Sequence, residues 1–166
     1  MKRYGLFVGV NKYSNGITPL SCARSDASSL FKAFLNEGYD LDLLIDEEAS
    51  QENVIANLRR KNFQSGDIFV FYFSGHGCEI NGNHFLLGST ADAGLLKFQI
   101  GMIPVSLICQ LTDTPGLRRL FILDSCRSDI FTSHKGIEKC PPSRNISLKK
   151  SLTKEMSQEL LFLRLF

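Results

Sequence analysis

A histidine and a cysteine that could act together in catalysis each follow an apolar segment of this sequence. His76 stands between two glycines in YFSGHG, and Cys126 follows Asp124 in LDSCRS. A cysteine attacks as its thiolate, and an imidazole that takes the thiol proton can later protonate a leaving amine. The pair therefore predicts nucleophilic catalysis, with His76 as general base and Cys126 as nucleophile.

The residues around this pair could complete a site. Glycines beside His76 remove side-chain bulk, so the amides of Gly77 and Cys126 are candidate oxyanion donors, and losing one such donor typically slows a reaction about 10²-fold or more. Asp124 ends an apolar strand, where an unpaired carboxylate is costly, and we expect it to serve a binding pocket. For Asp26, a simple interaction with a helix dipole is the alternative to a pocket role.

Four short apolar segments alternate with amphipathic stretches long enough for crossover helices. Continuous apolar segments are typical of strands in a parallel sheet that is covered on both faces. Sites in open α/β sheets form at the carboxyl ends of the strands, so His76 and Cys126 emerge side by side if their strands are neighbours. The sequence therefore predicts an α/β fold with strands over residues 4–10, 41–46, 67–74 and 119–124.

Helices are predicted over residues 25–37, 50–61 and 104–111. In the first, Leu30, Phe31 and Phe34 lie on one stripe, and in the second Ser50 is a suitable N-cap. Asn81-Gly82 between apolar flanks predicts a β-hairpin after the third strand.

The chain becomes polar and rich in Ser and Lys after residue 127. We expect one domain over residues 1–130 and a tail over 131–166. The spacing of Leu152, Met156, Leu160 and Leu163 fits a closing amphipathic helix, although the apolar ending LLFLRLF could equally require a partner surface.

Composition argues against several classes of function. The net charge is only +2, so we expect no nucleic-acid or membrane partner. The five cysteines contain no CxxC pair, which argues against a disulfide framework and a zinc site, and no metal or cofactor is expected. The apolar segment at residues 4–10 is too short for a signal peptide or a membrane span. We expect a cytoplasmic protein.

The motifs YFSGHG and LDSCRS resemble those of the caspase, metacaspase and paracaspase superfamily of cysteine peptidases. The resemblance extends to YGLFVGVNKY at the start and to LSCARSDA at residues 20–27, and it covers roughly residues 4–128. In caspases the histidine precedes the cysteine by about 50 residues, as His76 precedes Cys126. The resemblance implies a three-layer α/β/α fold with a mostly parallel sheet and a His/Cys dyad.

Asp26 and Asp124 match two positions of the metacaspase and paracaspase pattern, whereas animal caspases have an Arg-lined pocket and a QACRG-like motif. The resemblance therefore implies a cysteine endopeptidase that cuts a protein or peptide substrate after Arg or Lys. A complete caspase fold adds further strands and helices after the nucleophile, but only 40 residues follow Cys126. We expect this half to be missing or shortened: either the chain is a fragment or a truncated gene product, or a second chain or a second copy completes the sheet.

Two other functions compete with this interpretation. An inactive, truncated caspase-like module could act by binding another chain rather than by cleaving one. A receiver-like phosphoacceptor domain would also end a strand with an acidic residue such as Asp124. That domain requires an acidic pair after the first strand, which Gly9-Val10-Asn11 does not supply.

Overall fold

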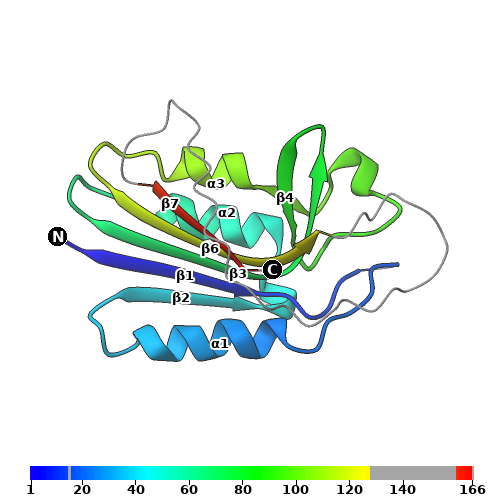
Figure 1. The fold of residues 1–166 in the computed structure, drawn as a ribbon, viewed down its shortest axis with the longest axis horizontal. Helices are drawn as coiled ribbons and strands as arrows, with labels where there is room; N and C mark the ends of the chain where they lie inside the picture. The colour runs from blue at the N-terminus through cyan, green and yellow to red at the C-terminus, as the bar shows by residue number, and fades with distance from the viewer. Residues whose placement is uncertain (15, 128–159, 166) are drawn as a thin grey trace.

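A twisted, mostly parallel sheet forms the centre of the molecule (Figure 1). The computed structural model describes residues 1–14, 16–127 and 160–165. Within them, five parallel strands lie side by side in the order β2 (Asp40–Ile45), β1 (Arg3–Gly9), β3 (Ile68–Ile80), β6 (Arg118–Arg127) and β7 (Leu160–Leu165). β4 (Asn83–Leu87) pairs antiparallel with the far end of β3, and β5 (Met102–Pro104) pairs antiparallel with β4.

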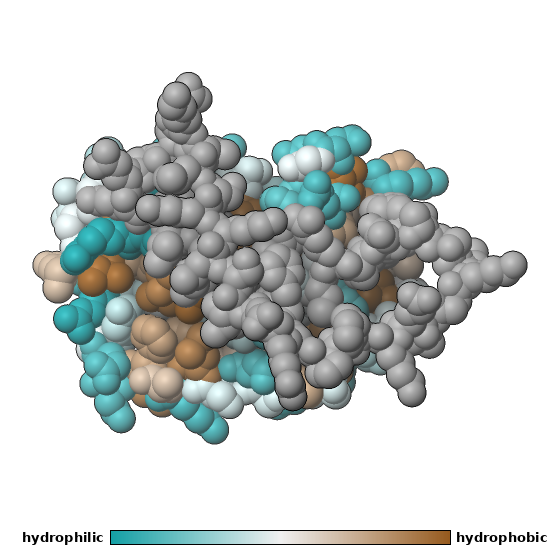
Figure 2. Space-filling model, in the orientation of Figure 1, coloured by the Kyte–Doolittle hydropathy of each residue, from teal (hydrophilic) through white to brown (hydrophobic). Residues whose placement is uncertain are grey.

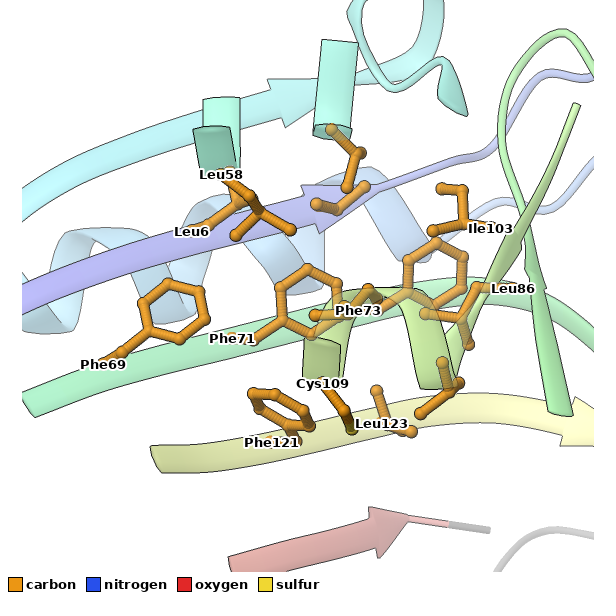
Figure 3. Close-up of a cluster of buried hydrophobic side chains, with 14 of the residues drawn as sticks. Leu6, Leu58, Phe69, Phe71, Phe73, Leu86, Ile103, Cys109, Phe121 and Leu123 are labelled. Carbon is orange, nitrogen blue, oxygen red and sulfur yellow. The ribbon is translucent and has the colours of Figure 1, made fainter. Parts of the chain in front are cut away.

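Helices cover both faces of this sheet. α1 (Ala23–Phe34) packs over one face, where Phe7, Val70 and Tyr72 contact Leu30 and its neighbours. α2 (Gln51–Arg60) and α3 (Val105–Leu111) cover the other face, where the large apolar core lies (Figure 3). That core contains the fully buried side chains of Leu6, Leu58, Phe69, Phe71, Phe73 and Phe121. The predicted three-layer α/β/α architecture with a mostly parallel sheet is confirmed.

Local sequence signals explain how these elements begin and turn. The Ser50 hydroxyl accepts the N–H of Asn53 at 3.2 Å and so caps α2, as predicted. Asn81 and Gly82 both have positive φ, 51° and 77°, between the paired residues Ile80 and Asn83. This is the two-residue hairpin geometry that favours Asn-Gly, and the predicted hairpin is confirmed.

Two strands run further than the sequence indicated. We predicted that β3 ends at Ser74, but it continues through His76 to Ile80, and β6 continues to Arg127. The cause is tertiary pairing, because residues 77–80 pair with β4 while the register with β6 extends to Gly77 and Arg127. His76 therefore lies within a strand rather than directly after one.

The apolar end of the chain is a strand and not a helix. The predicted helix was wrong for Leu160–Leu165, which forms β7 and pairs in parallel with β6. A continuous apolar segment suits a strand in such a sheet, and its pairing with β6 outweighs the helical spacing of its leucines. Leu152 and Met156 lie outside the described residues, as does the predicted domain boundary at residue 130.

The surface of the described part is mixed in character. Hydrophilic residues predominate along the outer rim of the coloured surface in Figure 2. Among the described residues, the large apolar side chains that are most exposed are Met1, Leu35, Leu95, Phe98 and Ile100. No helix in this part of the chain is both long enough and apolar enough to cross a bilayer.

Candidate active site

The register between β3 and β6 brings the two predicted catalytic positions together. His76 pairs with Cys126, two residues after Ser74 pairs with Asp124. Neighbouring strands are about 4.8 Å apart, and directly paired positions share one face of the sheet. The prediction that residues 76 and 126 lie side by side is therefore confirmed by the strand register.

A main-chain carbonyl holds the His76 imidazole. The Nε2 atom lies 2.8 Å from the carbonyl oxygen of Thr18, in the loop between β1 and α1. A carbonyl oxygen only accepts hydrogen bonds, so Nε2 carries the hydrogen and donates it. In the neutral ring this leaves Nδ1 as the acceptor, and Nδ1 is the atom that can act as a base.

Tyr13, from the same loop, holds the main chain of His76. The N–H of His76 donates to the Tyr13 hydroxyl oxygen at 2.7 Å, and this hydroxyl donates to the Val10 carbonyl at 3.1 Å. Burial is the main cause that raises the pKa of Tyr13 well above its ordinary value of 10, so the side chain stays a phenol. A Cβ added at Gly75 would lie 2.8 Å from the Tyr13 hydroxyl oxygen, which explains the glycine there.

The loop that carries Tyr13 and Thr18 is fixed at its start by Asp46. This carboxylate is only 3% exposed, and its Oδ1 accepts the main-chain N–H groups of Asn11 at 2.9 Å and Lys12 at 3.2 Å. The guanidinium of Arg24 lies 3.7 Å from Oδ2. Sequence reasoning missed Asp46, although it directly follows the apolar part of β2, the same signal that drew attention to Asp124.

Asn11 closes the loop on itself. Its main-chain carbonyl accepts the N–H of Leu20 at 2.8 Å, and its side-chain oxygen accepts the N–H of Arg24 at 3.1 Å. Its side-chain amide donates to the Ser21 carbonyl at 3.3 Å. These bonds tie the two ends of the loop together, so that the Thr18 carbonyl has a defined position.

The two predicted pocket carboxylates are also near each other. Asp26 is exposed in the first turn of α1, and Asp124 is half-buried on β6. Burial raises the pKa of Asp124, and the charge of Asp26 raises it further. Burial, followed by the charge of Asp124, raises the pKa of Tyr72 to about 12. The structure thus brings an acidic group of α1 near a second one on the sheet face on which strand alternation also places residue 76.

Gly77 lies beside these groups for a packing reason. An added Cβ would lie 3.0 Å from the Ser125 hydroxyl oxygen and 3.2 Å from the carbonyl oxygen of Phe85. Gly77 pairs with Leu86 on β4 and Arg127 on β6, in the interior of the sheet. Its predicted role as an oxyanion donor stays a prediction.

Other cysteines are less suited to chemistry. Burial raises the pKa of both Cys78 and Cys109 to about 11, which disfavours their thiolates at neutral pH. Cys22 is exposed at the N-terminus of α1, 3.5 Å from the Ser21 hydroxyl. Cys140 lies outside the described residues. In the described part of the chain, no three His, Cys, Asp or Glu side chains gather as metal ligands would.

A family model and a solved structure both match this chain. The family model for the caspase domain of C14 peptidases matches residues 2–160. A similar solved structure is protein GSU0716 from Geobacter sulfurreducens, with a TM-score of 0.63 and 21% identity. The match covers 76% of this chain and 51% of that one, so this chain spans about half the length of its structural neighbour. No curated protein matches the sequence.

Proposed function

The chain belongs to the caspase-domain family of peptidases, and we propose that it is a cysteine endopeptidase with a dyad of His76 and Cys126. The pairing of these two residues across β3 and β6 carries the proposal. It is supported by the hydrogen bond from Nε2 of His76 to Thr18, which leaves Nδ1 free to accept a proton.

In the proposed reaction, Nδ1 of His76 takes the proton of the Cys126 thiol, and the thiolate attacks the carbonyl carbon of the scissile peptide bond. The carbonyl oxygen becomes an oxyanion, for which the Gly77 amide is the proposed donor. The imidazolium then gives its proton to the leaving amine as the C–N bond breaks. A water molecule, deprotonated by the imidazole, hydrolyses the thioester and releases the acid product.

We further propose cleavage after Arg or Lys. A substrate guanidinium or ammonium would lie between Asp26 and Asp124, where it would neutralise two carboxylates that now repel each other. The raised pKa of Asp124 supports this role, because perturbed carboxylates in partly buried positions are typical of binding sites.

The test uses peptide reporters with Arg, Lys or Asp before the cleaved bond. We expect turnover of the Arg and Lys reporters, loss of turnover in Cys126→Ala and His76→Ala, and little hydrolysis of the Asp reporter. Cys109→Ala is the matched control, because it removes a buried thiol of α3 that is not part of the proposed dyad. Equal turnover by Cys126→Ala and the unmodified chain would contradict the dyad.

An inactive module is a second candidate. In such a module, a second chain or a second copy would pair with an edge of this sheet. Among the five parallel strands described, β2 and β7 are the outer ones, and β7 is the proposed site of such pairing. Light scattering that shows a monomer, together with reporter turnover, would exclude this candidate.

The proposed compartment is the cytoplasm. Cys22, Cys78 and Cys109 are free thiols, and such cysteines are typical of a reducing environment.

A further inference from the structure

A buried carboxylate outside the proposed dyad fixes the geometry around His76. Asp46 is almost fully buried, and burying a charge is costly unless hydrogen bonds compensate it. Here the compensation comes from the main-chain N–H groups of Asn11 and Lys12, which are far from Asp46 in sequence. Asp46 also has a left-handed φ of 46°, a conformation that aspartate and asparagine adopt more readily than most other residues with a Cβ.

These two N–H groups lie where the chain leaves β1. The Asp46 carboxylate therefore sets the direction in which the loop between β1 and α1 departs from the sheet. Asn11 passes this constraint on, because its own hydrogen bonds to Leu20, Ser21 and Arg24 close the loop.

This loop supplies the acceptors of two hydrogen bonds that His76 donates. The Thr18 carbonyl accepts the bond from Nε2, and the Tyr13 hydroxyl accepts the bond from the main-chain N–H. We propose that Asp46 is a positioning residue, which through Asn11 and the loop holds the Thr18 carbonyl and so keeps the His76 hydrogen on Nε2. This inference rests on the proposed function of His76 as a base acting through Nδ1.

The inference predicts a specific defect when Asp46 is lost. Without the carboxylate, the loop start loses both hydrogen bonds and the Thr18 carbonyl is no longer fixed. The imidazole then exchanges between its two neutral tautomers, and only one of them has a basic Nδ1. Because small misplacements of catalytic groups cost up to about 10²-fold in rate, we expect kcat to fall about 10-fold to 10²-fold. The KM should change little, because Asp46 is not placed in the substrate pocket.

The experiment compares Asp46→Ala and Asp46→Asn in the full chain. Nitrogen-15 NMR of the imidazoles reports the tautomer, and the His76 signals are assigned by their absence from His76→Gln, since the chain has only 3 histidines. Turnover of the Arg reporter gives kcat and KM. We expect Asp46→Ala to lose the pure Nε2–H signature and to lower kcat. Asp46→Asn should keep most of both, because its amide oxygen still accepts the two N–H groups.

Asp67→Ala is the matched control. Asp67 is equally buried, and it accepts the main-chain N–H groups of Lys2 at 2.7 Å and Gln64 at 3.0 Å, at the opposite end of the sheet. It should lower the melting temperature as Asp46→Ala does, and leave the His76 tautomer and kcat unchanged. If Asp46→Ala does not fold, Asn11→Ala, which removes the side-chain bonds that close the loop, should give the same tautomer defect.

The failures of the two proposals are distinguishable. An unmodified chain that cleaves no reporter would overturn the peptidase function, while the tautomer measurement would still test the role of Asp46. A wild-type tautomer signature in Asp46→Ala, or the same tautomer loss in Asp67→Ala, would overturn the positioning role even in an active enzyme.

Discussion

The Tyr13 hydroxyl accepts the main-chain N–H of His76 at 2.7 Å, while its ring lies against the imidazole with the centroids 5.0 Å apart. Tyr13→Phe keeps the ring and removes the acceptor, which leaves a partly buried N–H without this partner. Such a loss costs about 1–3 kcal/mol. We expect a lower melting temperature by calorimetry and a reduced kcat for the Arg reporter. An unchanged melting temperature would show that water replaces the hydroxyl.

Gly75→Ala should disturb the same contact from the other side. The added Cβ would meet both the Tyr13 hydroxyl oxygen and the Phe73 ring at 2.8 Å, so one of them must move. Overpacking of this kind typically costs about 1–3 kcal/mol. Urea unfolding measures the loss. The control is Gly94→Ala, whose nearest new contact is the Asp92 carboxylate oxygen at 3.3 Å, and which should unfold like the unmodified chain.

Asp124→Asn should stabilise the fold while it removes cleavage after basic residues. Because burial and Asp26 raise the pKa of Asp124 in the folded state, the folded chain binds this proton more tightly than the unfolded chain. Stability from this group is present at low pH and falls as pH rises from 3.8 through the raised pKa. The ionised carboxylate thus destabilises the protein at neutral pH. Asn removes this cost, and the melting temperature at pH 7 should rise.

The reporter assay completes the test of Asp124. Loss of a half-buried carboxylate that pairs with the substrate cation should lower kcat/KM for the Arg reporter by about 10²-fold. A stabilised variant with full activity would place the substrate cation elsewhere.

Cys78 and Cys109 should resist alkylation in the folded protein. Their thiols are buried, and burial raises the pKa of each to about 11, so few thiolates form at pH 7.5. Iodoacetamide followed by peptide mass spectrometry should modify exposed Cys22 first among these three. In urea all three should react alike. Rapid modification of Cys78 in the native chain would mean that the end of β3 opens.

Much of the framework could be predicted because each buried strand reads as an apolar segment. Those segments were enough to place residues 76 and 126 at the carboxyl ends of two strands, and the structure shows that these two strands are neighbours. The strand ends could not be predicted, because pairing with β4 extends β3 past His76. Leu160–Leu165 forms a strand because it pairs with β6. The periodicity of the sequence does not reveal this pairing.

The surroundings of His76 were hidden for a different reason. Thr18 contributes its main-chain carbonyl to the hydrogen bond with His76. Because every residue type has a main-chain carbonyl, the sequence does not indicate which residue provides this acceptor. Asp46 stands before Glu47 and Glu48, and three consecutive acids look like solvated surface. Only the path of the loop shows that one of the three is buried and holds main-chain N–H groups.

The pairing of β3 with β6 also determines when the site comes into being. His76 and Cys126 are distant in the chain, and parallel strands that join distant segments form slowly, after local helices and hairpins. A chain that has folded only as far as the β3 and β4 hairpin holds the histidine without its partner. Under the proposed function, a nascent copy would therefore lack the His76 and Cys126 dyad until β3 and β6 have paired.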